Sequence, residues 1–84
     1  MGKHEKLIDR LKTRPVNFTF GELEKLLGGF GYQLSNQGKS TGSAVRFVHD
    51  ERPPVRLHKP HPGNELKRYV INDVIEMLES EGLI

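Results

Sequence analysis

The sequence predicts an α+β fold in which helices pack on one face of a three-stranded antiparallel sheet, in the order α-α-β-β-β-α. Two segments with helical spacing of apolar residues come first, three short runs of alternating apolar and polar residues follow, and one further helical segment closes the chain. Consecutive alternating runs are typical of an antiparallel meander with one buried face. The helices are then expected to cover that face.

The first and last helices are predicted from apolar stripes. In residues 3–13, the side chains of Leu7, Ile8 and Leu11 share one face of a helix. This helix should end before Arg14-Pro15, because a proline disfavours the helical conformation in the residue that precedes it. The closing helix has an acidic outer face, ends before Gly82, and carries an apolar stripe made of Val70, Ile71, Val74, Ile75 and Leu78.

The second helix has clear signals at both ends. Thr19 and Glu22 match the capping-box pattern, in which a threonine side chain and a glutamate three residues later bond to each other's backbone amides. We expect Gly28-Gly29 to terminate the helix, since glycine commonly follows the last helical turn. Its buried stripe consists of Phe20, Leu23, Leu26 and Leu27.

The alternation in the three strands predicts which side chains face away from the helices. The apolar members of each run should point into the core, and these are Phe30, Tyr32, Leu34, Val45, Phe47, Val55 and Leu57. The residues of the opposite parity should share an open face, and these are Gln33, Ser35, Ala44, Arg46, Val48, Arg56 and His58. We expect His49, which has the inward parity near a strand end, to be a structural or rim residue.

The composition indicates one small domain over residues 1–84. A chain of 84 residues, 35% of them hydrophobic, can bury one compact core but no large enclosed cavity, so chemistry is expected on an open face. The absence of cysteine excludes disulfides, thiolate zinc sites and a cysteine nucleophile. The sequence lacks an apolar run long enough to span a bilayer and the apolar region of a signal peptide, so we expect a cytoplasmic protein with no membrane partner.

The near-neutral net charge of +2 hides a basic middle segment. Residues 38–68 carry seven Lys and Arg against three Asp and Glu, whereas residues 69–84 carry four acidic residues and no basic one. Three of the four histidines lie in the basic segment. Such a segment favours a phosphate-bearing partner. An ordinary solvated surface explains the same charges equally well.

Three stretches of this sequence form a distinctive set: residues 31–34, Gly42-Ser43 before a strand, and above all residues 58–67, which read HKPHPGNELK before the closing helix. Together they resemble the HicA toxin family, also called YcfA-like proteins. The resemblance extends from about Leu23 to Leu83. It implies a fold like that of double-stranded-RNA-binding domains and a type II toxin that cleaves mRNA and inhibits translation. It also implies a HicB-like antitoxin as partner.

One departure from the family bears on activity. The family motif is Gly-Ser-His, whose histidine is taken as catalytic, and here Gly42-Ser43 is followed by Ala44. Three explanations remain open: the alignment shifts by the extra residues 38–41, another group has replaced the histidine, or the protein does not cut RNA. The loop of residues 38–43 has the glycines, hydroxyls and lysine to hold a phosphate, but an ordinary hairpin loop has the same composition.

Metal-free RNA cleavage needs a base near neutral pH, an acid for the leaving oxygen and cations at the phosphate. Histidine suits the base, and we predict His58 in this role with His61 as the second acid/base or positioning group. The remaining predicted RNA contacts are cationic or hydroxyl side chains, namely Lys39, Ser43, Arg46, Arg56 and Lys59. His58 and His61 alone do not make a metal site, and we predict no metal or other cofactor.

Two other functions remain open on the sequence alone. A non-catalytic RNA-binding module is favoured by Ala44, and it would bind RNA with an affinity that falls steeply with salt. A pure interaction domain would instead dock an acidic partner protein on its basic face.

Overall fold

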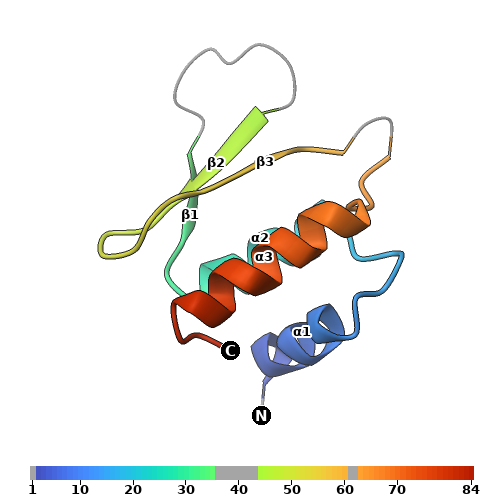
Figure 1. Ribbon diagram of the computed structural model, residues 1–84, viewed down its shortest axis with the longest axis horizontal. Helices are drawn as coiled ribbons and strands as arrows, with labels where there is room; N and C mark the ends of the chain where they lie inside the picture. The colour runs from blue at the N-terminus through green and yellow to red at the C-terminus, as the bar shows by residue number, and fades with distance from the viewer. Residues whose placement is uncertain (1, 36–43, 61–62) are drawn as a thin grey trace.

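The helices and strands follow one another in the predicted order. The computed structural model describes residues 2–35, 44–60 and 63–84, and Figure 1 shows their arrangement. The elements within these residues are α1 (Lys3–Lys12), α2 (Phe20–Gly29), β1 (Gln33–Ser35), β2 (Ala44–Val48), β3 (Val55–His58) and α3 (Arg68–Ser80). The predicted α+β class with an antiparallel three-stranded sheet is therefore confirmed.

The sheet has the order β1-β2-β3, with α2 and α3 on one of its faces (Figure 1). Leu34, Phe47 and Val55 are paired across the three strands and point toward the helices. The ring of Phe47 lies 5.9 Å from that of Phe20, which joins the sheet to α2. The remaining helix, α1, contacts α2 and α3 on the side away from the sheet. The helices thus form two layers behind one face of the sheet.

The core lies between the sheet and the helices. Its fully buried side chains come from all three helices, β2 and the segment before α2, and the largest are Phe18, Phe47, Leu11, Leu23, Leu26, Leu27, Ile71 and Leu78. No charged or polar residue among those described is buried. Burial of apolar surface is therefore the main favourable term in folding here. None of the described helices is both long and apolar enough to cross a membrane.

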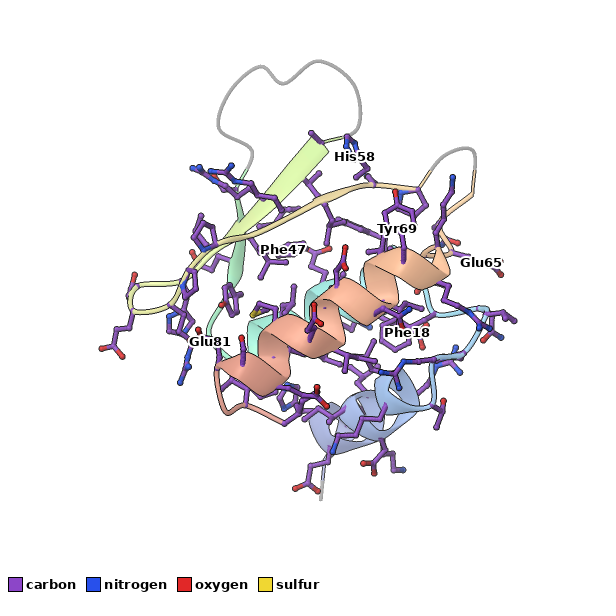
Figure 2. The ribbon with its side chains drawn as sticks, viewed as in Figure 1. Phe18, Phe47, His58, Glu65, Tyr69 and Glu81 are labelled. Atoms are coloured by element: carbon purple, nitrogen blue, oxygen red, sulfur yellow. The ribbon has the colours of Figure 1, made fainter. Side chains whose placement is uncertain are left out.

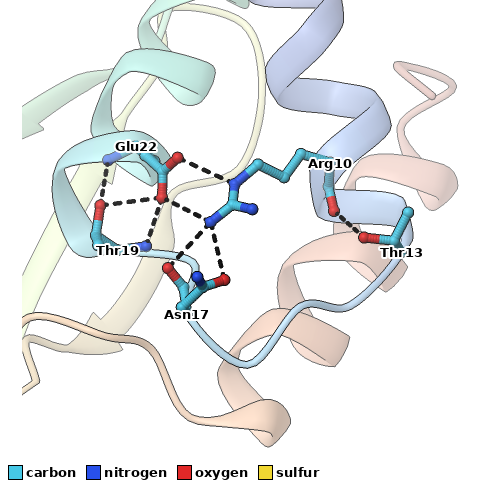
Figure 3. A network of polar contacts seen from close by, with 5 residues as sticks. All are labelled: Arg10, Thr13, Asn17, Thr19 and Glu22. Atoms are coloured by element: carbon cyan, nitrogen blue, oxygen red, sulfur yellow. Dashed lines mark hydrogen bonds and ion pairs between the residues drawn. The ribbon is translucent and has the colours of Figure 1, made fainter.

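The capping box predicted for α2 is present and extends into a network that joins α1 to α2 (Figure 3). The Thr19 amide donates to Oε1 of Glu22 at 2.9 Å, and the Glu22 amide donates to Oγ1 of Thr19 at 3.2 Å. Nε of Arg10 donates to Oε2 of the same carboxylate at 3.1 Å. The Arg10 guanidinium also bonds to Asn17 and lies 5.6 Å from the centre of the Phe18 ring. One carboxylate thus caps α2 and holds α1 against it.

The same contacts change the acidity of Glu22. Partial burial acts to raise the pKa of its carboxyl, but the hydrogen bonds from Thr19 and the charge of Arg10 outweigh it, so the pKa lies below its ordinary value. Its contribution to folding is therefore complete above the pKa of the unfolded chain. That contribution is lost as the pH falls through the lower pKa of the folded state.

The linker after α1 is fastened to the last helix. α1 ends before Arg14-Pro15, as predicted from the proline. Arg14 has a φ of 52°, in the left-handed region that a non-glycine residue adopts at a cost. Its Nε donates to Oδ1 of Asn72 at 2.8 Å, so α1, the linker and α3 are held together on the side away from the sheet.

α2 ends at Gly29, within the predicted Gly28-Gly29 pair, but these glycines do not follow the last helical turn as expected. Both glycines lie in the last turn of the helix, and the glycine with positive φ, at 98°, is Gly31. Packing of a residue distant in sequence explains the glycine at position 29. A Cβ on Gly29 would overlap the ring of His4, whose Nε2 lies 2.8 Å from the Leu26 carbonyl oxygen.

A second histidine packs closely against Gly31. A Cβ at position 31 would lie 2.9 Å from Nε2 of His49. The Glu51 amide donates to Nδ1 of His49 at 2.9 Å, so the ring proton resides on Nε2, which donates to the Phe30 carbonyl oxygen at 3.0 Å. His49 is therefore a structural residue, as its inward parity predicted.

The two helical glycines offer a matched test of this packing. Gly28→Ala should raise the free energy of unfolding by about 0.5–1 kcal/mol, because its Cβ meets nothing within 4 Å and alanine favours the helix. Gly29→Ala should lower it, because the new methyl group displaces the His4 ring. Urea denaturation measures both. In a His4→Ala background, Gly29→Ala should become stabilising; equal stability of the two single variants would contradict the packing described.

The carboxylate of Glu22 should make stability depend on pH. At pH 7, Glu22→Gln should lower the free energy of unfolding by about 1 kcal/mol, since it weakens a charge-assisted cap and an ion pair. The difference between the variant and the original chain should shrink below about pH 4, as the carboxyl becomes protonated. Urea denaturation from pH 3 to pH 7 tests this, and a difference independent of pH would count against the ionised cap.

Candidate nucleic-acid interface

The sheet face opposite the helices carries the side chains that the alternation predicted. We call it the outer sheet face, and its described members are Gln33, Ser35, Ala44, Arg46, Val48, Arg56 and His58. Strand pairing arranges them in rows across the sheet. Ser35, Arg46 and Arg56 form one row, and Ala44 and His58 form the next. None of these residues is acidic, so the face offers positive charge without a counter-charge of its own.

Arg46 and Arg56 are direct cross-strand neighbours. Side chains at such positions start about 4.5–5.5 Å apart, and two like charges there destabilise the sheet. Arg56 is exposed and Arg46 half-buried, so water screens the pair only in part. A bound anion such as a phosphate would remove this repulsion. Phosphate binding at this pair therefore relieves a repulsion, a gain that two separated arginines would not provide.

His58 occupies the corner where the outer sheet face meets the free edge of β3. It is exposed, it ends its strand, and its cross-strand partner is Ala44. Figure 2 shows it at the same end of the molecule as Tyr69, in the first turn of α3. An exposed imidazole beside two guanidinium groups can exchange a proton with a bound phosphate ester.

Two open hollows lie along the free edge of β3, and both are lined by His58 and Tyr69. The edge groove, of about 290 Å³, runs between β3 and α3. Its lining comprises residues 54–58 together with Tyr69, Val70, Asp73, Val74 and Met77. The end hollow, of about 260 Å³, lies beyond the end of β3. Its lining comprises His58, Lys59, Pro60, Leu66, Lys67, Tyr69 and Val70.

The end hollow is held in place by backbone bonds to the start of α2. The amide of Leu66 donates to the Phe18 carbonyl oxygen at 2.8 Å, and the amide of Phe20 donates to the Asn64 carbonyl oxygen at 2.7 Å. Leu66 is buried, and Nζ of Lys59 lies 5.4 Å from the centre of the Phe20 ring. Lys59 therefore belongs to the end hollow and not to the row of arginines.

The structure thus brings together Arg46, Arg56 and His58 and places Lys59 around the edge from them. Lys39, Ser43 and His61 lie outside the described residues, as does the loop of residues 38–43. In the described part of the chain, no three His, Asp or Glu side chains are grouped so that they could hold a metal ion.

Tyr69 was missed by the sequence argument. It is 57% exposed, whereas the apolar stripe used to predict α3 begins at the buried Val70. The signal available in the sequence was an aromatic residue off that stripe, directly after Lys67 and Arg68.

Residues 20–80 match the family model described as the HicA toxin of bacterial toxin-antitoxin systems. The chain belongs to this HicA toxin family. Membership implies an antitoxin partner. No curated protein and no solved structure matches the chain, so its likeness to double-stranded-RNA-binding domains stays a prediction.

The HicA match begins at the first residue of α2 and ends at the last residue of α3. It therefore includes the sheet, both hollows and the two helices that cover the sheet. α1 lies outside it, on the side of these helices away from the sheet. The outer sheet face is thus carried by elements within the match, and α1 lies behind them and outside it.

The arginine pair should be detectable as a coupling energy. Arg56→Thr should raise the free energy of unfolding by up to about 1 kcal/mol at low ionic strength, because it removes a like-charge neighbour of Arg46. This gain should disappear in about 1 M salt. A double-mutant cycle with Arg46→Thr isolates the pairwise part. Gains that simply add in the double variant, at low salt, would refute the repulsion.

Proposed function

We propose that this chain is an endoribonuclease toxin that cleaves mRNA and thereby inhibits translation. The observation that carries the proposal is the pairing of His58 with Ala44 on an outer sheet face lined by Arg46 and Arg56. Ala44 stands where the family motif has its histidine. His58, directly across from it, can deliver an imidazole to the same region of the face.

The register supports this replacement in distance as well as direction. Directly opposite residues of an antiparallel pair have Cβ atoms about 4.5–5.5 Å apart and lie on the same side of the sheet. An imidazole from position 58 therefore reaches over the small Ala44 side chain. A bulky residue at position 44 would occupy that space. The absence of a histidine at position 44 is therefore compatible with a site in which His58 supplies the imidazole.

In the proposed reaction, His58 accepts the proton of a ribose 2′-hydroxyl while the 2′-oxygen attacks the adjacent phosphorus. The bond from phosphorus to the 5′-oxygen breaks, and a second acid, for which His61 is the candidate, protonates that oxygen. The products are a 2′,3′-cyclic phosphate and a free 5′-hydroxyl. Arg46 and Arg56 stabilise the charge that develops on the phosphate oxygens.

The antitoxin in this proposal is a HicB-like protein that covers the outer sheet face. Masking this face would neutralise Arg46 and Arg56 and exclude RNA from His58. Acidic side chains on the partner would suit the uncompensated arginines.

A non-catalytic RNA-binding module is the second candidate, and the exposed methyl group of Ala44 favours it. In that case the outer sheet face binds RNA through its cations and leaves the strand intact. The two candidates differ in one measurable product, the cyclic phosphate.

Degradation of RNA by the purified chain should depend on His58. His58→Ala should slow cleavage by at least about 100-fold, the usual contribution of a positioned acid or base. The substitution is at an exposed strand end, so thermal unfolding should change little. The assay uses a labelled RNA with and without a metal chelator, and it reports both the rate and the terminal groups of the products.

Gln33→Ala is the matched control, because Gln33 lies on the same face and pairs with Val48, at the end of β2 opposite to Ala44. It should cleave at nearly the original rate. Equal rates for His58→Ala and the original chain would refute the assignment of His58. Binding without cleavage by the original chain would establish the non-catalytic module instead.

A further inference from the structure

Tyr69 is the one exposed ring among the six Phe and Tyr residues, all of which lie in the described part of the chain. Phe18, Phe20, Phe47 and Tyr32 are buried and Phe30 is half-buried, whereas Tyr69 is 57% exposed. Tyr32 also donates its hydroxyl to the Pro53 carbonyl oxygen at 2.9 Å. Among the described residues, no hydrogen bond or ring contact engages Tyr69. Its ring therefore has a free surface that folding does not use.

The ring of Tyr69 borders open space on two sides. It lines the edge groove and also the end hollow, and His58 lines both with it. Both spaces are open to solvent, and their volumes lie just below the usual range of small-molecule sites, so each suits a single planar group. A flat ring inserted at this point would lie against Tyr69 within reach of His58.

The charges around Tyr69 differ between its two sides. Among the described residues, the lining of the end hollow includes Lys59 and Lys67 and no carboxylate. The edge groove contains Asp73, one helical turn after Tyr69, and also Arg56, whose charge Asp73 offsets. A ligand with both an aromatic ring and a negative group would thus place its charge in the end hollow, where the two lysines are not offset by a carboxylate of the lining.

We infer that Tyr69 is a stacking platform for one unpaired nucleobase of the RNA, with the adjoining phosphate held by Lys59 and Lys67. The inference rests on the proposed RNA function and narrows its substrate class to single-stranded RNA. Aromatic rings stack on bases only where these are splayed out of a helix, since in a duplex their faces are already covered. Tyr69 thus sets which part of a strand reaches His58.

The lysine charge distinguishes this ligand from a protein segment. A nucleotide can stack its base on the phenol ring while its phosphate pairs with the two ammonium groups. An apolar peptide would bring no anionic partner for Lys59 and Lys67. The nearby Arg56 and His58 extend the same positive path onto the outer sheet face, so consecutive phosphates of one strand can follow it.

Binding of a strand that cannot be cleaved tests the inference apart from catalysis. The probe is an octamer of 2′-O-methyl adenosine, whose blocked 2′-oxygens cannot attack the phosphate. Tyr69→Leu should weaken its binding about tenfold, the effect of losing one base–aromatic stack. Tyr69→Phe should retain the affinity, since stacking needs the ring and not the hydroxyl. Fluorescence anisotropy of a labelled octamer measures both.

Intrinsic fluorescence gives a second readout, because the chain has two Tyr and no Trp. The octamer should quench the emission of the original chain and quench that of Tyr69→Phe far less, since the remaining Tyr32 is buried. A duplex made from the octamer and its complement should show no dependence on Tyr69. Thermal unfolding of each variant confirms that the exposed substitution leaves the fold intact.

The outcomes separate this inference from the proposed function. If Tyr69→Leu binds the octamer as well as the original chain does, the platform is refuted even where RNA cleavage by His58 is established. Loss of affinity for the antitoxin alone would also refute it and assign the ring to a protein contact. A tenfold loss on the octamer supports the platform whether or not the chain cleaves RNA.

Discussion

The pairing register of β2 with β3 is the constraint on which the other features depend. It places Phe47 beside Val55 on the helix side and Arg46 beside Arg56 on the open side. Because side chains alternate along a strand, a shift of one residue would bury the arginines and expose the phenylalanine. The core therefore enforces the repulsive arginine pair. It also sets His58 against Ala44, so the same burial that stabilises the fold assembles the candidate site.

The second determinant is the anchoring of the chain after the sheet. The bonds that link Phe18 and Phe20 to the segment 64–66 fix where α3 begins. With Leu66 buried beside them, the first turn of α3 stands next to the end of β3. The exposed side chains of His58 and Tyr69 thereby share one region. A chain of this size has little volume to enclose a ligand, and its chemistry lies where elements meet at the surface.

The sequence was most informative where one local rule decided the structure. The alternation of Phe47 with Arg46 predicted both faces of the sheet, and the capping residues predicted where α2 begins. The last residue of α2 was predicted, but the packing of the glycines around it was not, because the rings of His4 and His49, distant in sequence, lie against Gly29 and Gly31. Tyr69 was missed because its importance comes from hollows formed by β3 and α3 together. The proposed roles of Lys39, Ser43 and His61 remain predictions.

The free edge of β3 also bears on how the molecule avoids pairing with copies of itself. An exposed strand edge is a template for adding further strands. Here the strand spans only Val55–His58, with Pro53-Pro54 before it and Pro60 after it. Proline lacks an amide hydrogen, so an added strand could gain few hydrogen bonds before its ladder stopped. The edge can therefore stay open to a ligand without becoming a site of aggregation.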